Sequence, residues 1–299
     1  MSVHHGTETV SLERLSPRDL VEVFGYLDRD PVLNVYLTAL VLRDSLAQVR
    51  DEFWAARRGG MLVGLLHLGG PSGSLLPLTS DPEAARRMSD LACERLSFMP
   101  RRFQVIGPRA VVGDFTHRLR RAGLAPRLFR AQTYMALARP ALPTFERVPE
   151  LRAAHAEDYD VIYESGAQLR AEELEEDPRN ADAAAYARRV QEECRDGYTS
   201  LWLDGKGLCF RASVSARTPD AVQISGVYTP PERRNRGFAR RGVSELCARL
   251  FEHSRNACLF VNDFNAPALA VYQRIGFRKI AEWASAFYDL GRGERPAAR

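Results

Sequence analysis

The order of secondary-structure elements expected from this sequence occurs twice along its 299 residues. Each half runs through two helices, three antiparallel strands, a helix, a strand, a helix and a last strand, judged from apolar periodicity. The halves are joined by ARPALPTFERVPE, residues 138–150, which has three prolines and no periodic pattern. Although the halves share little residue identity, the repeated order of elements indicates a tandem structural duplication.

This repeat predicts an α+β (α/β) chain of two tandem folds, each a mixed, mostly antiparallel sheet flanked by helices. The predicted division is a first domain over residues 1–140, a linker over 141–152 and a second domain over 153–299. Each domain is long enough to bury a core of its own.

The expected elements are placed by residue number as follows. In the first half they are two short helices within 16–48, strands at 52–58, 61–68 and 74–78, a helix at 81–97, a strand at 104–107, a helix at 110–122 and a strand at 131–138. In the second half they are helices within 156–195, strands at 199–203, 207–213 and 222–228, a helix from about 237, a strand at 259–261, a helix and a final strand.

Bulk composition argues against several classes of partner. The formal net charge of +4 arises from 42 basic and 38 acidic residues without a long basic run, so nucleic-acid binding is not expected. Five cysteines lack CxxC or Cys/His metal spacing, which favours reduced thiols and no metal. The start, MSVHHGTETV, has no apolar signal core, and no run approaches the ~20 apolar residues that span a bilayer. We therefore expect a cytoplasmic protein with no membrane partner.

One stretch, residues 223–254, combines an apolar strand, a Pro-Pro loop and a helix that begins near Gly237. The loop contains Arg234-Asn235-Arg236-Gly237-Phe238-Ala239. Gly237 and the small Ala239 allow backbone N–H groups to approach a pyrophosphate at the helix N-terminus. The helix dipole favours such an anion by about 0.3–1 kcal/mol. Taken alone, the run fits equally well a basic loop that only caps a helix.

A second stretch, LFVNDFNAPALAVYQRIGFRKI, covers residues 259–280. It predicts a strand, then Asn265, a helix that carries Tyr272, the pair Gly276-Phe277 and a last strand. The two stretches together resemble the GNAT superfamily of acyl-CoA-dependent N-acetyltransferases, whose R-x-x-G-x-G/A signature is matched from Arg234 to Ala239. The second half also resembles a narrower bacterial group of two-part GNAT proteins.

The resemblance implies acetyl-CoA, or another acyl-CoA, as co-substrate. The implied cofactor-binding residues are Val227, Tyr228, Thr229, Arg234, Asn235, Arg236, Gly237, Phe238, Ala239, Arg240, Asn265 and Tyr272. Asn265 would hydrogen-bond the pantetheine arm or adjacent backbone, and Tyr272 would point its hydroxyl at the CoA sulfur. A phenol of pKa ~10 is protonated at neutral pH, so Tyr272 could donate to the leaving thiolate. The alternative is a helix residue that only packs its ring.

The strand at 224–228 is expected to diverge from 259–261 and to leave backbone groups that pair with pantetheine. The N–H of Val227 or Tyr228 could then polarise the thioester carbonyl. Direct transfer also needs a neutral amine, and Glu173 and Glu172 in an acidic segment are the candidate bases. The alternative is a solvated acidic helix face. The acidic segment favours a cationic acceptor.

The first half lacks the signature. At the corresponding loop it has Thr79-Ser80-Asp81-Pro82-Glu83-Ala84, which places negative charge where a pyrophosphate would lie. We therefore interpret it as a degenerate, non-catalytic GNAT-like domain.

The predicted function is an N-acyltransferase that moves an acetyl or short acyl group from acyl-CoA to a primary amine in a ternary complex. The acceptor is a small molecule, a peptide or a protein, and the enzyme a monomer or homodimer. Two alternatives remain open: a catalytically silent CoA-binding or interaction module, and a transferase of larger acyl or aminoacyl groups.

Overall fold

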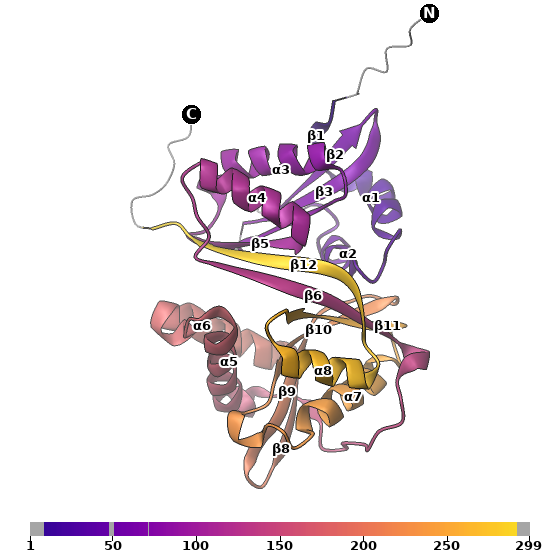
Figure 1. The fold of residues 1–299 in the computed structure, drawn as a ribbon, viewed down its shortest axis with the longest axis vertical. Coiled ribbons are helices and arrows are strands. Elements are labelled where there is room, and N and C mark those ends of the chain that lie inside the picture. The colour runs from indigo at the N-terminus through magenta and orange to yellow at the C-terminus, as the bar shows by residue number, and fades with distance from the viewer. Residues whose placement is uncertain (1–8, 48–50, 71, 292–299) are drawn as a thin grey trace, which may run out of the picture. The chain divides into compact units, whose positions relative to one another are not determined.

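A computed structural model describes residues 9–47, 51–70 and 72–291 of the chain. These residues form two compact units (Figure 1). The first consists of the described residues of 1–133 and 281–299, and the second of residues 134–280. Both combine helices with a mixed, mostly antiparallel sheet, which confirms the predicted fold class.

The first unit contains four helices and, by sheet order, the strands β1-β2-β3-β4-β5-β12-β6 among its described residues. The strands are β1 (Ser11–Arg14), β2 (Asp51–Arg58), β3 (Met61–Gly69), β4 (Ser74–Thr79), β5 (Arg102–Pro108), β6 (Leu128–Ala138) and β12 (Arg278–Asp289). The helices are α1 (Leu20–Leu27), α2 (Val35–Asp44), α3 (Pro82–Glu94) and α4 (Arg109–Arg121).

Consecutive residues of β3 and β4 enter two different cores in this unit. Leu66 and Leu75 pack with residues of α3 and α4, whereas Leu65 and Leu76 pack with residues of α1 and α2. Side chains alternate between the two faces of a strand, so one helix pair covers each face. This two-sided burial explains why the strands are apolar at nearly every position.

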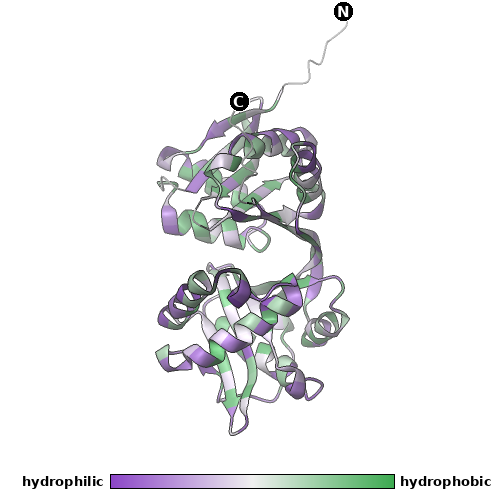
Figure 2. Ribbon diagram, turned by 90° about the vertical axis from the view of Figure 1, so that its left-hand side faces the viewer, coloured by the Kyte–Doolittle hydropathy of each residue, from purple (hydrophilic) through white to green (hydrophobic). Residues whose placement is uncertain are grey.

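The second unit has the sheet order β6-β11-β10-β9-β8-β7. Its strands are the end of β6, β7 (Arg152–Ala153), β8 (Thr199–Asp204), β9 (Gly207–Arg217), β10 (Ala221–Tyr228) and β11 (Asn256–Asn262). Its helices are α5 (Tyr159–Leu174), α6 (Pro178–Asp196), α7 (Phe238–Leu250) and α8 (Ala266–Ile275). Figure 2 shows hydrophilic and hydrophobic residues side by side along the helices, as expected where amphipathic helices cover a sheet.

The last strand of each half of the chain pairs with strands of the other half: β12 lies in the first unit, and the end of β6 lies in the second. β12 pairs antiparallel with β5, from Trp283 opposite Pro108 to Asp289 opposite Arg102. β6 begins in the first unit and continues into the second from Tyr134 onward, where it neighbours β11. The compact units therefore group the last strands differently from the predicted division at 1–140 and 153–299. Alternation of apolar residues identifies a strand but does not specify its partner.

The segment 141–152, predicted as a linker, packs against α7. Val148 and Leu151 are fully buried, and the Val148 N–H donates to the Glu245 carboxylate at 3.1 Å. The short strands β1 and β7 were not predicted, because segments this short are too short to show a periodic pattern. Within the described ranges, no helix combines the length and apolarity that a membrane crossing requires.

Candidate active site

The site is built at the ends of β10 and β11 in the second unit. These strands pair in parallel, from Ala221 opposite Asn256 to Ile224 opposite Leu259. β10 continues to Tyr228 and β11 to Asn262, so the parallel ladder stops before either strand ends. Because parallel strands place their carboxyl ends at one edge, the loops that follow them meet there. The early end of the ladder agrees with the expected divergence of the two strands.

β10 also carries a β-bulge in this region. Ser225 lies opposite Ser213 and Tyr228 opposite Arg211 on β9, so three steps on β10 match two on β9. Gly226 occupies the bulge with φ +59°, in the left-handed region that favours glycine. A bulge removes one residue from the antiparallel ladder and re-aims the backbone beside it. Val227, one of the predicted oxyanion donors, therefore lies within a distorted segment of the strand.

Tyr228, the other predicted donor, is buried and donates its hydroxyl to Gln168 Oε1 of α5 at 2.7 Å. Burial, and then the nearby Glu172 carboxylate, raise the pKa of its phenol. The next residue, Thr229, is buried and its carbonyl accepts from Arg234 Nε at 3.0 Å. These contacts fix the start of the loop between β10 and α7.

An ion pair between a buried arginine and an exposed carboxylate anchors that loop to the end of β8. Arg233 is 4% exposed and donates from Nη2 to Asp204 Oδ1 at 2.6 Å and from Nη1 to Oδ2 at 3.0 Å. The Arg233 guanidinium is the main cause that lowers the pKa of Asp204 to about 2. A two-point guanidinium–carboxylate contact fixes direction as well as distance. The predicted CoA loop is therefore held at its base.

Beyond this anchor the chain turns twice through left-handed conformations. Asn235 has φ +60° and Gly237, the N-cap of α7, has φ +79°. Backbone N–H groups in such turns point into a shared concavity that suits anions. The α7 N-terminus has no side-chain cap, and no heavy atom of the described chain lies within 4 Å of the position that a Cβ on Gly237 would take. Its first N–H groups are thus available to a ligand.

Cationic and small residues surround this turn. Arg234, Arg236 and Arg240 are exposed, and Ala239 is half-buried in the first turn of α7. Phe238 packs its ring against Trp202, with the centroids 5.0 Å apart. An uncapped helix N-terminus with three exposed arginines beside it is suited to bind a diphosphate.

Asn265 is the N-cap residue of α8. Its side-chain oxygen accepts from the Ala268 N–H at 3.1 Å, so it caps the helix. Of the two roles that the resemblance implied for Asn265, the structure shows the contact with adjacent backbone.

Tyr272 lies on α8, is 6% exposed and packs edge-on against Phe277. Its hydroxyl has no hydrogen-bond partner among the described residues. Burial raises the pKa of the phenol above its ordinary value, and the Glu173 carboxylate adds to the rise. Tyr272 therefore stays protonated at neutral pH and retains a proton to donate. The electrostatic effect of Glu173 also shows that the end of α5 lies near this tyrosine.

The two candidate bases have different surroundings. Glu172 is exposed, and both of its carboxylate oxygens accept from Arg234 Nη2, each at 2.8 Å. Glu173 is half-buried and lies close to Tyr272. Adjacent helix residues point about 100° apart, which separates the two carboxylates. Glu173 is thus placed with the candidate acid, and Glu172 with the candidate phosphate-binding loop.

Two residues near the site were missed in the sequence. Gln168 gave no signal, because a polar residue on a helix is ordinary. Arg211 gave one, since it interrupts the apolar run Leu208-Cys209-Phe210 of a predicted strand, and it is 3% exposed in the structure. No group of three or more His, Cys, Asp or Glu side chains suited to a metal occurs in the described residues.

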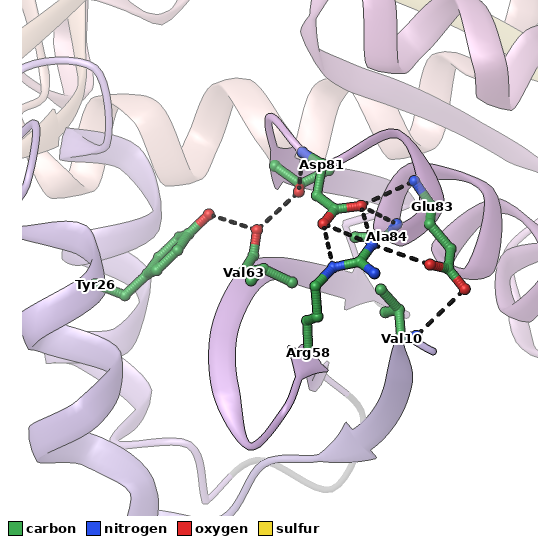
Figure 3. A network of polar contacts seen from close by, with 8 residues as sticks. Val10, Tyr26, Arg58, Val63, Asp81, Glu83 and Ala84 are labelled. Atoms are coloured by element: carbon green, nitrogen blue, oxygen red, sulfur yellow. Dashed lines mark hydrogen bonds and ion pairs between the residues drawn. The ribbon is translucent and has the colours of Figure 1, made fainter. Parts of the chain in front are cut away.

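In the first unit the corresponding helix is α3, and a side chain of the protein itself caps its N-terminus (Figure 3). Asp81 Oδ1 accepts from the Glu83 N–H at 2.9 Å and the Ala84 N–H at 3.1 Å. Arg58 bridges Asp81 and Glu83, with nitrogen–oxygen distances of 2.9 Å to each. The contacts that a phosphate would make at α3 are therefore made by a carboxylate.

The strands beside α3 also approach closely. A Cβ on Gly107 of β5 would lie 2.7 Å from the Pro77 carbonyl oxygen of β4. The parallel ladder of β4 and β5 also ends early, at Leu75 opposite Val105.

Comparison with known proteins agrees with this geometry. Residues 212–287, which include the loop, α7 and α8, match the model of the family described as FR47-like protein. A GCN5-related N-acetyltransferase from Sphaerobacter thermophilus is similar in structure, with a TM-score of 0.58, 15% identity, and coverage of 95% of this chain and 96% of that one. The chain has the GNAT fold.

Two other structural comparisons extend over nearly the whole chain. A Drosophila protein has a TM-score of 0.64 at 16% identity, covering 92% of this chain and 98% of that chain. A tandem GNAT protein from the clavulanic acid biosynthesis pathway has a TM-score of 0.50 at 17% identity, covering 95% and 99%. At these identities the likeness establishes the fold, and the resemblance seen in the sequence is confirmed. No protein with curated function matches the sequence.

Proposed function

We propose that the second unit transfers an acetyl or short acyl group from acyl-CoA to a primary amine in a single ternary complex. The observation that carries this proposal is the uncapped, arginine-lined turn of residues 234–237 at the α7 N-terminus. It lies at the same sheet edge as the β10 bulge and α8. The candidates for a phosphate-binding turn, an oxyanion donor and a proton donor therefore all belong to one unit.

The chemistry assigns one role to each group. The turn and Arg236 hold the diphosphate, while backbone N–H groups of Val227 and Tyr228 stabilise the oxyanion. The amine nitrogen attacks the thioester carbon, so a C–N bond forms and the C–S bond breaks. Glu173 accepts the proton that the amine loses, and Tyr272 donates its proton to the leaving sulfur. The products are an amide and the CoA thiol.

The test is thiol release from acetyl-CoA across a panel of amines, with wild type compared with Tyr272→Phe. We expect kcat to fall by about 100-fold or more, within the range for loss of a general acid, and the KM for acetyl-CoA to stay within about 3-fold. Tyr198→Phe is the matched control, because Tyr198 is 60% exposed. Wild-type kcat in Tyr272→Phe would refute the role of this phenol.

The same panel separates the two alternatives. Tight CoA binding without turnover on any amine would favour a silent binding module. Faster turnover with longer acyl-CoAs than with acetyl-CoA would favour a transferase of larger acyl groups. The buried, protonated Tyr272 favours catalysis, because a module that only binds CoA has no use for a proton donor.

A further inference from the structure

One arginine of the second unit lacks a counterion. Arg170 of α5 is half-buried, and its guanidinium has no hydrogen bond or ion pair with any described residue. Its contact is with the Tyr186 ring, whose centroid lies 5.9 Å from Arg170 Cζ. Burial, and then repulsion from Arg189, lower the pKa of Arg170 to about 10, so it is still a cation at neutral pH. Burial of an unpaired charge is costly, so such a group usually has a ligand.

The surroundings of Arg170 carry an excess of positive charge. The charged side chains with the largest effects on its pKa are Arg189, the Glu193 carboxylate and Arg211. That carboxylate is already engaged, because Glu193 Oε1 accepts from Arg211 Nη2, Ser213 Oγ and Thr199 Oγ1. We call Arg170, Arg189 and Arg211 the basic cluster.

Arg211 of the basic cluster has an unsatisfied side-chain hydrogen-bond donor. Its Nη1 donates to the Ile162 carbonyl at 3.0 Å and to Ser165 Oγ at 3.2 Å. Its Nε is buried and has no hydrogen-bond partner. An unmet buried donor beside an unpaired cation is the pattern expected of a site for an anion.

The basic cluster lies next to the proposed catalytic groups. A Cβ on Gly166 would lie 2.7 Å from the Tyr186 hydroxyl and 3.1 Å from Arg211 Nη1, so the cluster packs on the α5 turn before Arg170. Glu173 follows Arg170 by three residues, a separation that places Cβ atoms about 5–6 Å apart on one side of a helix. A small acceptor could therefore present its amine to Glu173 and an anionic group to Arg170.

We propose that the basic cluster binds a substrate carboxylate, so that the acceptor in the transfer proposed above is an amine that also bears a carboxylate, such as an amino acid. A guanidinium matches a carboxylate in charge and in two-point geometry. This inference rests on the proposed function and narrows its substrate class. It departs from the cationic acceptor expected from the acidic segment, since Glu172 is paired with Arg234 and Asp177 with Arg179.

The test compares amino acids with their amides, which keep the amine and lose the carboxylate charge. We expect wild type to prefer the acid in kcat/KM by about 10- to 100-fold. Arg170→Met should raise the KM for the acid by a similar factor and leave the amide and acetyl-CoA unchanged. Arg170→Lys should restore part of the preference. Arg188→Met is the matched control, because Arg188 is exposed on α6.

A second arm locates the carboxylate, because the acyl donor could also supply it. Succinyl-CoA replaces acetyl-CoA with the same acceptor pairs. A preference for succinyl-CoA that depends on Arg170, without acid-over-amide preference, would support the cluster as a carboxylate site that serves the donor. Absence of both preferences in wild type, or preferences that survive in Arg170→Met, would overturn the proposal.

Failure of the proposed function gives a different result. It appears as no thiol release with any donor or acceptor pair. Calorimetric titration of CoA-loaded protein with the acid and with its amide then tests the basic cluster without turnover. Tighter binding of the acid, lost in Arg170→Met with an unchanged melting temperature, supports the cluster, and equal binding of the two overturns it.

Discussion

The shape of the candidate CoA turn depends on the backbone conformation of one residue, Gly237. Its φ of +79° shapes the backbone turn that leads into the α7 N-terminus. Space is not the constraint there, because a Cβ would meet no described atom within 4 Å. Conformation is the constraint, since an L residue in the left-handed region costs about 1–2 kcal/mol.

Gly237→Ala should therefore weaken acetyl-CoA binding by about 10-fold, because a shift of the turn away from positive φ displaces the N–H groups that bind phosphate. Stability should fall by no more than about 1–2 kcal/mol. Titration calorimetry and urea unfolding measure the two effects. Gly205→Ala is the control, since a Cβ there also meets open space and its φ is not positive. Equal affinity in both variants would contradict the assignment.

The adjacent carboxylates Glu172 and Glu173 should differ in effect. Glu173→Gln should lower kcat/KM at neutral pH by about 10- to 100-fold and remove the acidic limb of the pH profile, because it removes the base. Glu172→Gln should leave kcat unchanged and leave the KM for acetyl-CoA equal or lower, since it releases Arg234 from an exposed ion pair of little energy. The reverse pattern would exchange their roles.

At the scale of elements, one buried carboxylate joins α7 to the segment 141–152. Glu245 is 1% exposed and accepts from Arg147 at 2.7 Å and from the Val148 N–H at 3.1 Å. Arg249 also donates to it, at 2.9 Å. Arg147 is the main cause that lowers the pKa of Glu245 from 4.5 to about 2. This carboxylate positions the helix whose N-terminus forms the candidate CoA turn.

The lowered pKa of Glu245 predicts a pH-dependent stability. A carboxyl group that is more acidic in the folded state stabilises it above pH 4.5, and the contribution is lost as pH falls toward 2. Glu245→Gln should therefore lower the free energy of unfolding by ~2–3 kcal/mol at pH 7, with a smaller difference near pH 3. Urea unfolding over this range measures it, with Glu252→Gln, an exposed neighbour, as control. A difference that does not change with pH would exclude the ion pair as its source.

At the scale of the whole molecule, two units of similar fold differ at the helix N-terminus where a GNAT fold would bind CoA. The α7 N-terminus is uncapped and lined by arginines, whereas the α3 N-terminus is capped by Asp81 and paired with Arg58. We propose that the first unit is degenerate and that each chain has one CoA site. The difference lies in a few side chains rather than in the fold.

Titration calorimetry should therefore give one CoA per chain. Arg234→Ala combined with Arg236→Ala should weaken this site by at least about 10-fold, because it removes two cations beside the phosphate position. Arg58→Gln should leave stoichiometry and affinity unchanged, since it changes only the first unit. Two equivalents of CoA in wild type would contradict the assignment of a single site.

The sequence by itself determined the order of the elements, the fold class and the turn at Arg234 to Ala239. These depend on local periods, on glycine's access to positive φ and on residue spacing, all of which are written along the chain. Tertiary structure alone decided the partner of β12, the different surroundings of Glu172 and Glu173, and the unpaired charge of Arg170. Strand pairing, burial and charge balance depend on residues far apart in sequence, so no local pattern could specify them.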